Sequence, residues 1–593
     1  MTTEQTTSPP RAGVGIAAQG LTRSVRSGRQ ILADVSLSIV PGELVAIIGA
    51  SGAGKTTLLE VLAGIQRPTT GTVTYDGTAG AGAIGVVPQD DIIHRELPLA
   101  RTLRYAARLR LPASTGATEI SARVAEVLAE LRLTDRAATP VGLLSGGERK
   151  RASIAVELLT RPGVFFLDEP TSGLDPAIAV ELLRVLRALA DAGATVVLTT
   201  HQVTDVDHCD RVVVLTRAGR LAFSGSPAAA REFFGLRSLV EVHLRLDEAT
   251  RPTEWPDRFA TQRTTEQRPT EQQPATAQRT TERPAAEQPA TAQRTTERPA
   301  ARTADDCGLA ATPTRRVGRL RQWAVLTARN AEIVARNRLT LAILLGSPLM
   351  VLGMFALLFR PGAFEPTTPS PTVTVMILFW IAFGGFFFGL TYGLLQICTE
   401  LPVLRRERLA GVRLAPYLLA KVAVLLPLLA LVDLALLGVL RGMDRLPPVG
   451  GSDFAALYAT LLLSSAAALA LGLLCSAAVS DAAQATLMLP MLCFPQVLFV
   501  GAILPVPAMA VGGQWLSYAM SNRWAFEGLG HTAGVERLWR DGGSPLGPPL
   551  LATYGESFSR PVWVDWLVLG GFVLLFLGAA WAVLLRRDPR RAS

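Results

Sequence analysis

The chain has 593 residues with a net charge of +9, and 49% of its residues are hydrophobic. Its long apolar runs all follow about residue 339, whereas the first 240 residues have the composition of a soluble α/β protein. The arginines gather beside apolar segments, as they do on the cytoplasmic flanks of membrane spans, so the basic balance does not indicate nucleic acid as a partner. Composition therefore predicts a membrane protein with a soluble domain in front.

The cysteines and the amino terminus indicate where the soluble domain resides. Five cysteines are scattered without C-x-x-C pairs, so the sequence indicates neither a zinc site nor a disulfide framework, and we expect packing roles for them. Residues 1–11 lack the apolar core of a secretory signal. We therefore expect the soluble domain to stay in the cytosol.

The first motif is a phosphate-binding loop. An apolar, strand-like run over 43–48 precedes Gly-Ala-Ser-Gly-Ala-Gly-Lys-Thr-Thr at 49–57, and a helical pattern follows. This is the P-loop pattern in its strand–loop–helix context. Backbone N–H groups close around the β-phosphate, Lys55 neutralises β and γ oxygens, and the Thr56 hydroxyl is placed for Mg²⁺. The residues predicted to hold the nucleotide here are Gly49, Ser51, Gly52, Gly54, Lys55, Thr56 and Thr57.

A second pair of motifs lies between residues 144 and 175. Ser145, Gly146 and Gly147 precede a helical segment, where bare N–H groups and the helix dipole favour an anion. The apolar run 164–167 then ends in Asp168 and Glu169. A buried strand would deliver both carboxylates to the sheet edge, with Asp168 holding Mg²⁺ through water and Glu169 orienting the attacking water as a base.

Gln89 and His201 each follow a strand-like run. Taken alone, such a glutamine is usually a surface residue and such a histidine is usually structural. The carboxyl ends of parallel strands share one edge with the P-loop, which is where sheets of this class keep their ligands. We therefore expect His201 to contact the γ-phosphate, and Gln89 to join the catalytic and Mg²⁺ sites.

In this order, the motifs of residues 12–240 resemble the ATPase of ABC transporters. The sequences at 52–60, 89–91, 146–155 and 168–175 are similar to those of the G subfamily, the White or eye-pigment type. The order of ATPase before membrane domain is also that of this subfamily. The resemblance implies ATP as substrate with Mg²⁺, and each ATP held between one P-loop and the Ser-Gly-Gly of a second copy. It adds Asp175 to the ATP-binding residues and predicts a homodimeric half-transporter.

Two positions depart from that family. Val25 stands where many relatives stack adenine on an aromatic side chain, so base selectivity is left open. Pro98 to Arg101 replaces a segment that often carries a glutamate, which puts an acidic coupling contact in doubt. The long external segment lacks cysteines, so the disulfides of some relatives cannot form.

Residues 241–312 read as a linker. The segment 275–285 recurs at 290–300, and the stretch is rich in Thr, Gln, Glu, Arg, Pro and Ala with almost no large apolar side chains. Such a composition buries too little surface to offset chain entropy, so we expect disorder. A bare tether and a docking segment regulated through its threonines are both compatible with this composition.

The remainder predicts an all-α membrane domain. A basic helix over 313–338 reads as interfacial, and six apolar runs are long enough to span a bilayer. The flanks that would share one side hold most of the arginines, so we expect both termini in the cytosol and the protein in the plasma membrane. The runs cover about 339–359, 373–397, 416–439, 454–479, 483–506 and 562–585.

Within this domain, two sets of residues are candidates for coupling and cargo. The segment 400–421 resembles the coupling region of ABC-2 type domains, with Glu400, Glu407 and Arg408 as coupling residues, although an ordinary charged loop would look alike. Asp433, inside the third span, is either a functional carboxylate or a partner of Arg441 or water. Relatives carry cargo along the second and fifth spans, which here supply aromatic and amide side chains that otherwise pack against lipid and helices: Phe383, Phe387, Gln396, Phe494, Gln496 and Phe499.

The sequence thus predicts an α/β P-loop ATPase domain followed by a six-span helical domain. The function expected from the resemblance is ATP-driven export of a hydrophobic or amphipathic molecule by a homodimer in the lipid bilayer. A lipid-linked glycan is an alternative cargo. A membrane-tethered mechanochemical or signalling ATPase that transports nothing is an alternative of another class, which six full spans disfavour.

Overall fold

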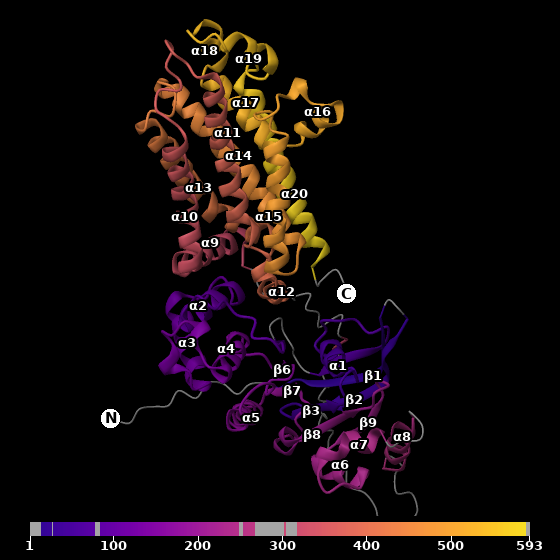
Figure 1. The fold of residues 1–593 in the computed structure, drawn as a ribbon. Helices are drawn as coiled ribbons and strands as arrows, with labels where there is room; N and C mark the ends of the chain where they lie inside the picture. Colours follow the sequence, from indigo (N-terminus) through magenta and orange to yellow (C-terminus); the bar gives the residue numbers. More distant parts are fainter. Residues whose placement is uncertain are drawn as a thin grey trace, which may run out of the picture.

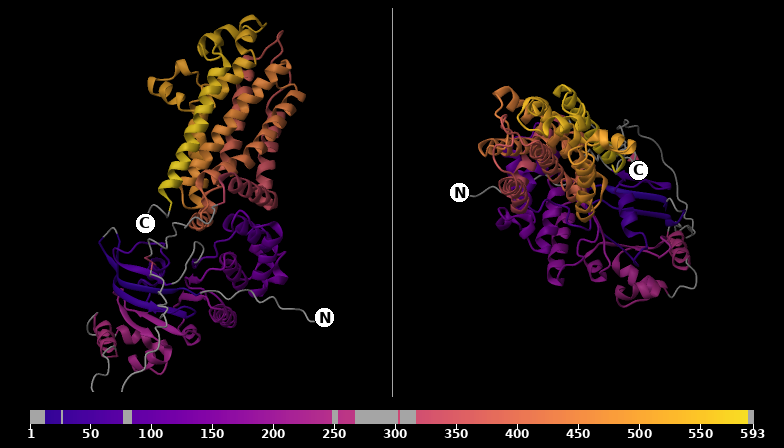
Figure 2. Two further views of the ribbon diagram at one scale, coloured as in Figure 1. Left: turned by 180° about the vertical axis from the view of Figure 1, so that it is seen from behind. Right: turned by 45° about the horizontal axis from the view of Figure 1, so that its top comes forward.

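The structure is a computed structural model that describes residues 13–25, 28–76, 84–247, 253–266, 302–303 and 317–588. An α/β domain forms one end of the molecule and a bundle of long helices forms the other, as the views in Figures 1 and 2 agree. The predicted fold class, an α/β ATPase-type domain followed by a helical membrane domain, is confirmed.

Two sheets build the α/β domain. The first is parallel except for its last strand, and its order is β5 (Ile84–Val87), β6 (Val164–Leu167), β7 (Thr195–Thr199), β3 (Leu44–Gly49), β8 (Arg211–Leu215) and β9 (Leu221–Gly225). The second is antiparallel, and its order is β10 (Arg302–Thr303), β4 (Thr70–Asp76), β1 (Gly15–Ser24) and β2 (Gln30–Ile39). The central strands β3, β6 and β7 are buried on both faces, which explains their continuous apolar sequences.

Helices cover the sheets and form a separate layer beside them (Figure 1). The layer that faces the membrane bundle contains α2 (Leu99–Arg110), α3 (Ala117–Glu130) and α4 (Gly146–Leu158). The other helices of the domain are α1 (Lys55–Leu62), α5 (Pro176–Asp191), α6 (Pro227–Phe234), α7 (Val242–Asp247) and α8 (Glu254–Glu266).

Part of the range expected as a linker is helical. Helices α7 and α8 lie inside the range 241–312, and α8 packs on β9 and α6 through Trp255 and Phe259, which are 5% and 8% exposed. Their rings contact Phe223, Phe233 and Phe234 at centroid separations of 5.0 to 6.1 Å. Two aromatic residues at helical spacing bury enough apolar surface to order this part. The repeats at 275–300 lie outside the described residues.

The membrane domain begins with α9 (Arg319–Arg336), which lies across the base of the bundle (Figure 1). Over the described residues, five helical stretches are long and apolar enough to cross a membrane. They contain α10 (Arg338–Leu358), α11 (Pro371–Leu394) with the short η5 (Cys398–Glu400) and α12 (Leu401–Leu409) continuing it, α13 (Leu414–Gly442), α14 (Gly451–Ala478) and α20 (Val562–Arg586).

The apolar run expected as a span over 483–506 is shorter in the structure. Its helix, α15 (Ala482–Leu498), has 17 residues, and the chain then turns at Gly501, whose φ is +95°. Prolines at 505 and 507 deny the rest of the run a continuous helix. A cap of short helices follows at the far end of the bundle: α16 (Val511–Tyr518), α17 (Ser521–Thr532), α18 (Val535–Asp541) and α19 (Gly547–Tyr554).

Helices α11 and α14 make the most extensive helix–helix contact in the bundle. A side chain at Gly385 would come within 2.4 Å of Leu461, and one at Gly389 within 2.1 Å of the backbone oxygen of Ser465. Glycines four residues apart on one face let two membrane helices approach until their backbones touch. The two glycines therefore permit the close approach of α11 to α14.

Candidate functional site

The P-loop connects β3 to α1, as predicted. Gly52 and Gly54 have φ of +79° and +89°, which only glycine adopts without strain. The N-terminus of α1 has no side-chain cap, so its first N–H groups are available to an anion. Lys55 donates from Nζ to the carbonyl oxygens of Gly49 at 3.0 Å and Ala50 at 3.3 Å. The lysine is thus held over the loop where a phosphate would lie.

Two predicted metal ligands are in contact. The Thr56 hydroxyl donates to Asp168 Oδ1 at 3.1 Å, and the Thr199 hydroxyl donates to the same oxygen at 2.6 Å. A hydroxyl and a carboxylate side by side beside a phosphate loop are the hard oxygen donors that Mg²⁺ prefers, with phosphates and water completing its shell. These residues therefore fit the cation that the sequence predicts.

The three predicted catalytic side chains converge at the same edge of the sheet. Gln89 donates from Nε2 to Glu169 Oε2 at 3.1 Å, and His201 Nδ1 lies 3.3 Å from that oxygen. Glu169 has a φ of +43°, unusual for a residue with a side chain, and its N–H donates to the Thr199 hydroxyl at 2.9 Å. Backbone strain of this kind concentrates at functional sites, and here it aims the carboxylate toward Gln89 and His201.

The Ser-Gly-Gly motif opens α4. Ser145 is exposed and forms a capping box with Glu148, which orients the first turn. Gly147 is required by packing, because a side chain there would come within 2.3 Å of Ile178 on α5. Asp175 caps α5 by accepting from the N–H of Ala177 at 2.9 Å. The capping box engages the N–H groups of Ser145 and Glu148, and the motif places Ser145 and Gly146 at an accessible helix end.

Lys150 connects this helix to the Gln89 segment. Its ammonium donates to the carbonyl oxygens of Gln89 at 2.5 Å and Pro88 at 3.4 Å, and its side chain is buried. Burial lowers the pKa of Lys150, while Asp91 and Asp168 oppose this effect. Sequence reasoning missed this contact because a lysine inside a helix carries no local signal of a buried role.

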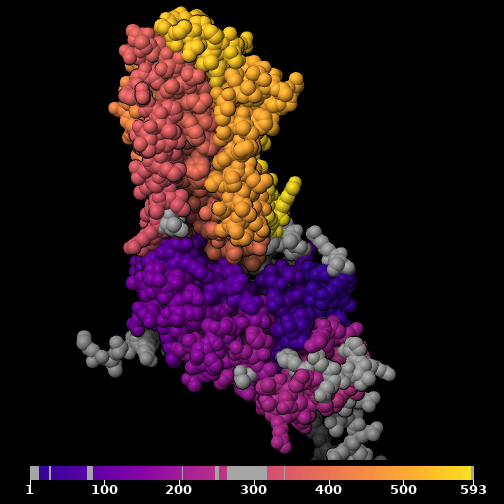
Figure 3. Space-filling model, in the orientation of Figure 1, coloured from indigo at the N-terminus to yellow at the C-terminus, as the bar shows by residue number. Residues whose placement is uncertain are grey.

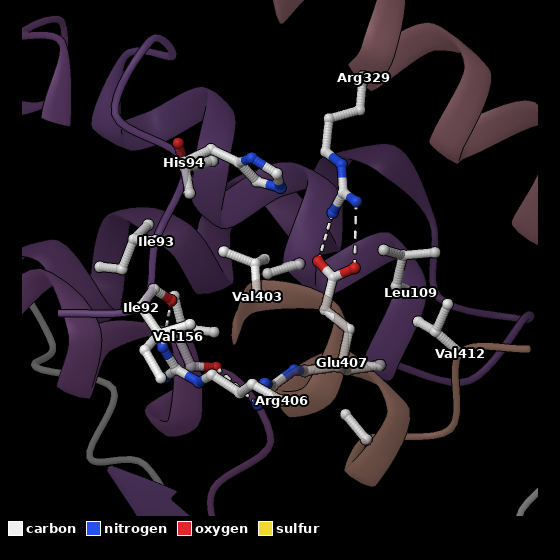
Figure 4. Close-up of a pocket in the computed structure, with 14 residues that line it drawn as sticks. Ile92, Ile93, His94, Leu109, Val156, Arg329, Val403, Arg406, Glu407 and Val412 are labelled. Carbon is white, nitrogen blue, oxygen red and sulfur yellow. Dashed lines mark hydrogen bonds and ion pairs between the residues drawn. The ribbon is translucent and has the colours of Figure 1, made fainter. Parts of the chain in front are cut away.

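The interface between the two domains centres on Arg406 of α12, which the sequence analysis did not select. Its guanidinium donates to Glu157 Oε1 at 2.7 and 2.9 Å, to the carbonyl oxygen of Ser153 at 2.7 Å and to that of Ile92 at 3.0 Å. Arg110 of α2 contacts Glu157 from the other side at 2.7 Å. Arg406 and Glu157 are only 8% and 6% exposed, so a side chain of the membrane domain is buried in the ATPase domain at this contact. Figure 4 shows Arg406 beside Ile92 and Val156 of the ATPase domain.

The charge of Glu157 is secured by these arginines. Burial alone would favour its neutral form, but Arg110 and Arg406 outweigh burial and lower its pKa to about 2. A buried carboxylate between two guanidinium groups is stable only while both partners remain. The contact between the domains is therefore sensitive to loss of either arginine.

The predicted coupling residues lie on the same segment with different partners. Glu407 forms an ion pair with Arg329 of α9, with Nη2 and Oε2 at 3.0 Å (Figure 4). Glu400 contacts Lys421 at 2.7 Å, and Arg408 pairs with Asp588. These hydrogen-bond and ion-pair partners belong to the membrane domain, so the three residues hold α12 in place while Arg406 reaches the ATPase domain.

His94 lies beside this contact, between Gln89 and α2. It is 7% exposed and its Nε2 has no hydrogen-bond partner. A small cavity with about 30 Å³ open to water lies next to it, lined also by Arg329, Arg406 and Glu407 (Figure 4). Burial and then the charge of Arg329 lower the pKa of His94 to about 4. The imidazole is therefore neutral in this packed arrangement at physiological pH.

A second contact between the domains joins α2 to α9. Tyr105 donates from its hydroxyl to Glu332 Oε2 at 2.8 Å, and Arg101 lies 3.8 Å from the same oxygen. The segment 98–101, which departs from the family pattern, thus supplies the basic residue Arg101, and the acidic partner Glu332 lies on α9 of the membrane domain. Neither segment alone indicates which domain supplies the basic residue and which supplies the acidic residue.

The residues predicted to line a cargo path separate into two groups. Phe494 is 66% exposed on α15, and Phe383, Phe387, Gln396 and Phe499 are partly exposed. Gln496 differs, because it is 5% exposed and its side-chain oxygen accepts from the N–H of Asn522 at 3.0 Å. Gln496 therefore points into its own protomer and fixes α17 against α15, which removes it from the outward-facing set.

Asp433 also differs from the expected pairing. Arg441 instead donates to the carbonyl oxygen of Val449 at 3.1 Å and lies 5.2 Å from the Phe454 ring centroid. Asp433 is fully buried, and neither of its carboxyl oxygens has a hydrogen-bond partner. The pairing with Arg441 is therefore wrong.

Comparison with known proteins agrees with this architecture. Residues 32–172 match the ABC transporter family and residues 321–532 match the ABC-2 type transporter family. The chain is 30% identical over 590 residues to the ABC transporter ATP-binding/permease protein Rv1747 of Mycobacterium tuberculosis, which covers 96% of this chain and 63% of that protein. It is 40% identical over 232 residues to ABC transporter G family member 22 of Arabidopsis thaliana, covering 37% of this chain and 30% of the plant protein. G family member 26 of that plant is also 40% identical, over 226 residues, covering 36% of this chain and 33% of the plant protein.

The two domains, in this order and with these motifs, define an ABC transporter chain. The chain belongs to the ABC transporters with an ABC-2 type membrane domain, and it is similar to members of the G family. It spans less than two thirds of the length of these relatives.

Proposed function

We propose that this chain is a half-transporter that forms a homodimer, hydrolyses Mg-ATP and exports a hydrophobic or amphipathic molecule across the plasma membrane, with its ATPase domain and both termini in the cytosol. The observation that carries the proposal is the convergence of Gln89 and His201 on the carboxylate of Glu169 beside the P-loop. Arg406 supports the coupling of this site to the membrane domain, because it reaches the ATPase domain from the membrane domain.

In this proposal, each group at the ATP site has a distinct task. Lys55 and the N–H groups of the P-loop bind the phosphates, and Thr56 with Asp168 would hold the cation. Mg²⁺ when bound would supply charge neutralisation for the phosphate oxygens. Glu169 accepts a proton from the attacking water, while Gln89 and His201 orient that carboxylate and contact the γ-phosphate. The strained backbone of Glu169 keeps its carboxylate at this edge.

Dimerisation is supported at both ends of the molecule. Ser145 and Gly146 present an uncovered helix N-terminus, which suits a nucleotide held by a second copy. In the membrane domain, α15 exposes Leu487, Met491 and Phe494, which are 70%, 74% and 66% exposed and lie along one helix face. Figure 3 shows the α15 segment, in orange, on the surface of the bundle. A second copy and an apolar cargo would both suit such a face.

The buried contact between Arg406 and Glu157 supports coupling of the ATPase domain to the membrane domain. Closure of two ATPase domains around nucleotide would move α2 and α4, and Glu157 on α4 is bonded to Arg406 of α12. Because α12 is joined to α11 and is held by α9 through Arg329 and Glu407, the movement would reach the spans as one unit.

The substitution Glu169→Gln tests the proposal. It keeps the hydrogen bond from Gln89 possible but removes the base, so we expect ATP hydrolysis by the purified protein to fall by a factor of about 100 or more. ATP should remain trapped, and chromatography with ATP should show the associated dimer. The matched control is Glu181→Gln, a partly exposed residue paired with Arg151, which should keep the parent rate.

If the Glu169→Gln protein hydrolyses ATP at the parent rate, Glu169 is not the base. If parent protein in liposomes hydrolyses ATP but no lipid or drug of a broad panel changes that rate or moves across the bilayer, the proposed transport is wrong and the tethered ATPase takes its place.

A further inference from the structure

Asp433 is a carboxyl group without a partner in the middle of the membrane bundle. It lies on α13, is fully buried, and neither Oδ1 nor Oδ2 has a hydrogen-bond partner. An ionised carboxylate left in an apolar interior without a counter-charge is very costly. The group must therefore be neutralised in this arrangement by something bound to it.

The hydroxyl groups around Asp433 show what can neutralise it. The hydroxyl of Ser465 on α14 lies close enough to affect the carboxyl group, and it is fully buried with no hydrogen-bond partner. Tyr392 of α11 and Tyr458 of α14 also lie near Asp433. Both tyrosines use their single proton elsewhere, on the carbonyl oxygens of Leu344 at 2.5 Å and Ala430 at 3.1 Å.

The charged groups on the neighbouring helices lie elsewhere. Helix α10 carries the exposed Arg338 at its first residue and no titratable side chain over 341–358, and α20 carries Asp565 and Arg586 at its two ends. On α14, Asp453 is exposed in the first turn, and Cys475 belongs to a different buried cluster. The charged residues of α9 lie at the base of the bundle (Figure 1). No cationic side chain among the described residues neutralises Asp433.

A metal ion fits this place poorly. Sodium, calcium and magnesium each need about six oxygen ligands, whereas one carboxyl group and one serine hydroxyl are unpartnered at this point. Over the described residues, the structure also holds no cluster of three or more acidic, histidine or cysteine side chains suited to a metal. A proton needs no such shell, and a neutral carboxyl group can donate to the Ser465 hydroxyl.

We propose that Asp433 is a proton-binding site of the membrane bundle, which holds a proton while α13 and α14 are packed together and gives it to water when these helices part during turnover. In that step, the carboxyl O–H bond breaks, the electron pair stays on Asp433, and the proton passes to water admitted beside Ser465. Binding of the proton stands on the packing alone, whereas its release rests on the proposed transport cycle.

Infrared spectroscopy of the full-length protein in liposomes tests the binding. At neutral pH, the parent should show the carbonyl band of a neutral carboxylic acid, shifted by deuterium oxide. Asp433→Asn should lose that band, and the control Asp453→Asn, which alters an exposed carboxylate, should keep it. In parallel, the rate of ATP hydrolysis by the parent should change with pH over a range in which Asp433→Asn shows no such change. Asp453→Asn should behave as the parent.

Three outcomes overturn the proposal. The first is a parent spectrum identical to that of Asp433→Asn, and the second is an acid band that appears only when sodium and potassium are removed, which would assign a metal cation. The third is an identical pH profile for ATP hydrolysis in the parent and in Asp433→Asn. If Asp433→Asn does not fold, Ser465→Ala decides: a shifted acid band supports the site and an unshifted band rejects it. Because the infrared reading needs no turnover, a parent that fails to hydrolyse ATP would reject the proposed function without affecting this test.

Discussion

At the scale of single residues, arginines of the same helix differ in burial and in their partners. Arg405, Arg406 and Arg408 are chemically alike in sequence, yet Arg405 is exposed, Arg408 pairs with Asp588, and Arg406 enters the ATPase domain. Glu157 would be an unremarkable helical glutamate without the two arginines that meet on it. A buried ion pair of this kind is costly to break, because its partner stays behind in a dry place.

The first prediction concerns this pair. Arg406→Ala should destabilise the protein by about 2–4 kcal/mol, since it removes five hydrogen bonds and leaves Glu157 with one arginine. Thermal unfolding of the purified protein measures the loss. The control Arg405→Ala alters an exposed arginine on the same helix and should stay within about 0.5 kcal/mol of the parent.

A double-mutant cycle with Glu157→Gln identifies the interaction. We expect a coupling energy above about 1 kcal/mol between the two positions. Additive effects would mean that Arg406 acts through its backbone contacts with Ser153 and Ile92, and the ion pair would then be of no consequence.

At the scale of elements, the membrane bundle depends on the approach of α11 to α14. Gly385 and Gly389 recur four residues apart, and a side chain at either would collide with α14. Association of membrane helices depends on such packing, because lipid offers no hydrophobic drive between them. Ser465, which lies at this contact, and Asp433 of α13 are both fully buried.

The second prediction tests this contact. Gly389→Ala would place a carbon 2.1 Å from the backbone oxygen of Ser465, so the helices must separate, at a cost of about 1–3 kcal/mol. Resistance of the detergent-solubilised protein to unfolding by SDS should fall accordingly. The control is Gly438→Ala on α13, where nothing lies within 4 Å of the added carbon, and this change should be neutral or slightly stabilising. Equal behaviour of the two variants would refute the role of Gly389.

At the scale of the whole molecule, a soluble domain and a membrane domain are joined through an interface that contains both ion pairs and apolar side chains. Helices α2 and α4 meet α9 and α12 there, and buried ion pairs lie among apolar side chains at the contact (Figures 1 and 4). His94 is the titratable group in this interface whose ordinary pKa lies near physiological pH. Its pKa of about 4 in the packed arrangement lies below its ordinary value of 6.5.

The third prediction follows from the sign of that shift. As pH falls through 6.5, His94 in the separated arrangement takes up a proton, whereas packed His94 does so only near pH 4. The contact is therefore fully stable above about pH 6.5 and weakens as pH falls toward 4, by up to about 3 kcal/mol.

Hydrogen exchange of the α12 amides, corrected for the intrinsic effect of pH, measures this weakening. Protection should fall between pH 6.5 and 5 in the parent and stay constant in His94→Gln. His208→Gln, which changes an exposed histidine of the ATPase domain, should behave as the parent. A parent with constant protection over this range contradicts the prediction.

The sequence by itself determined the features that local patterns encode. The P-loop, the strand ending in Asp168 and Glu169, and the apolar runs carry short-range signals of period and spacing, and the fold class followed from them. The meeting of Gln89, Glu169 and His201 could also be expected, because parallel strands deliver their carboxyl ends to one edge.

Only the tertiary structure decided which side chains lose contact with water. Arg406 differs from its neighbours, Gln496 turns inward and Asp433 stays without Arg441 because distant helices surround them. Likewise, α8 is ordered within the expected linker because Trp255 and Phe259 pack against three phenylalanines on other elements. Burial and pairing depend on contacts between segments far apart in the chain, and no local pattern records them.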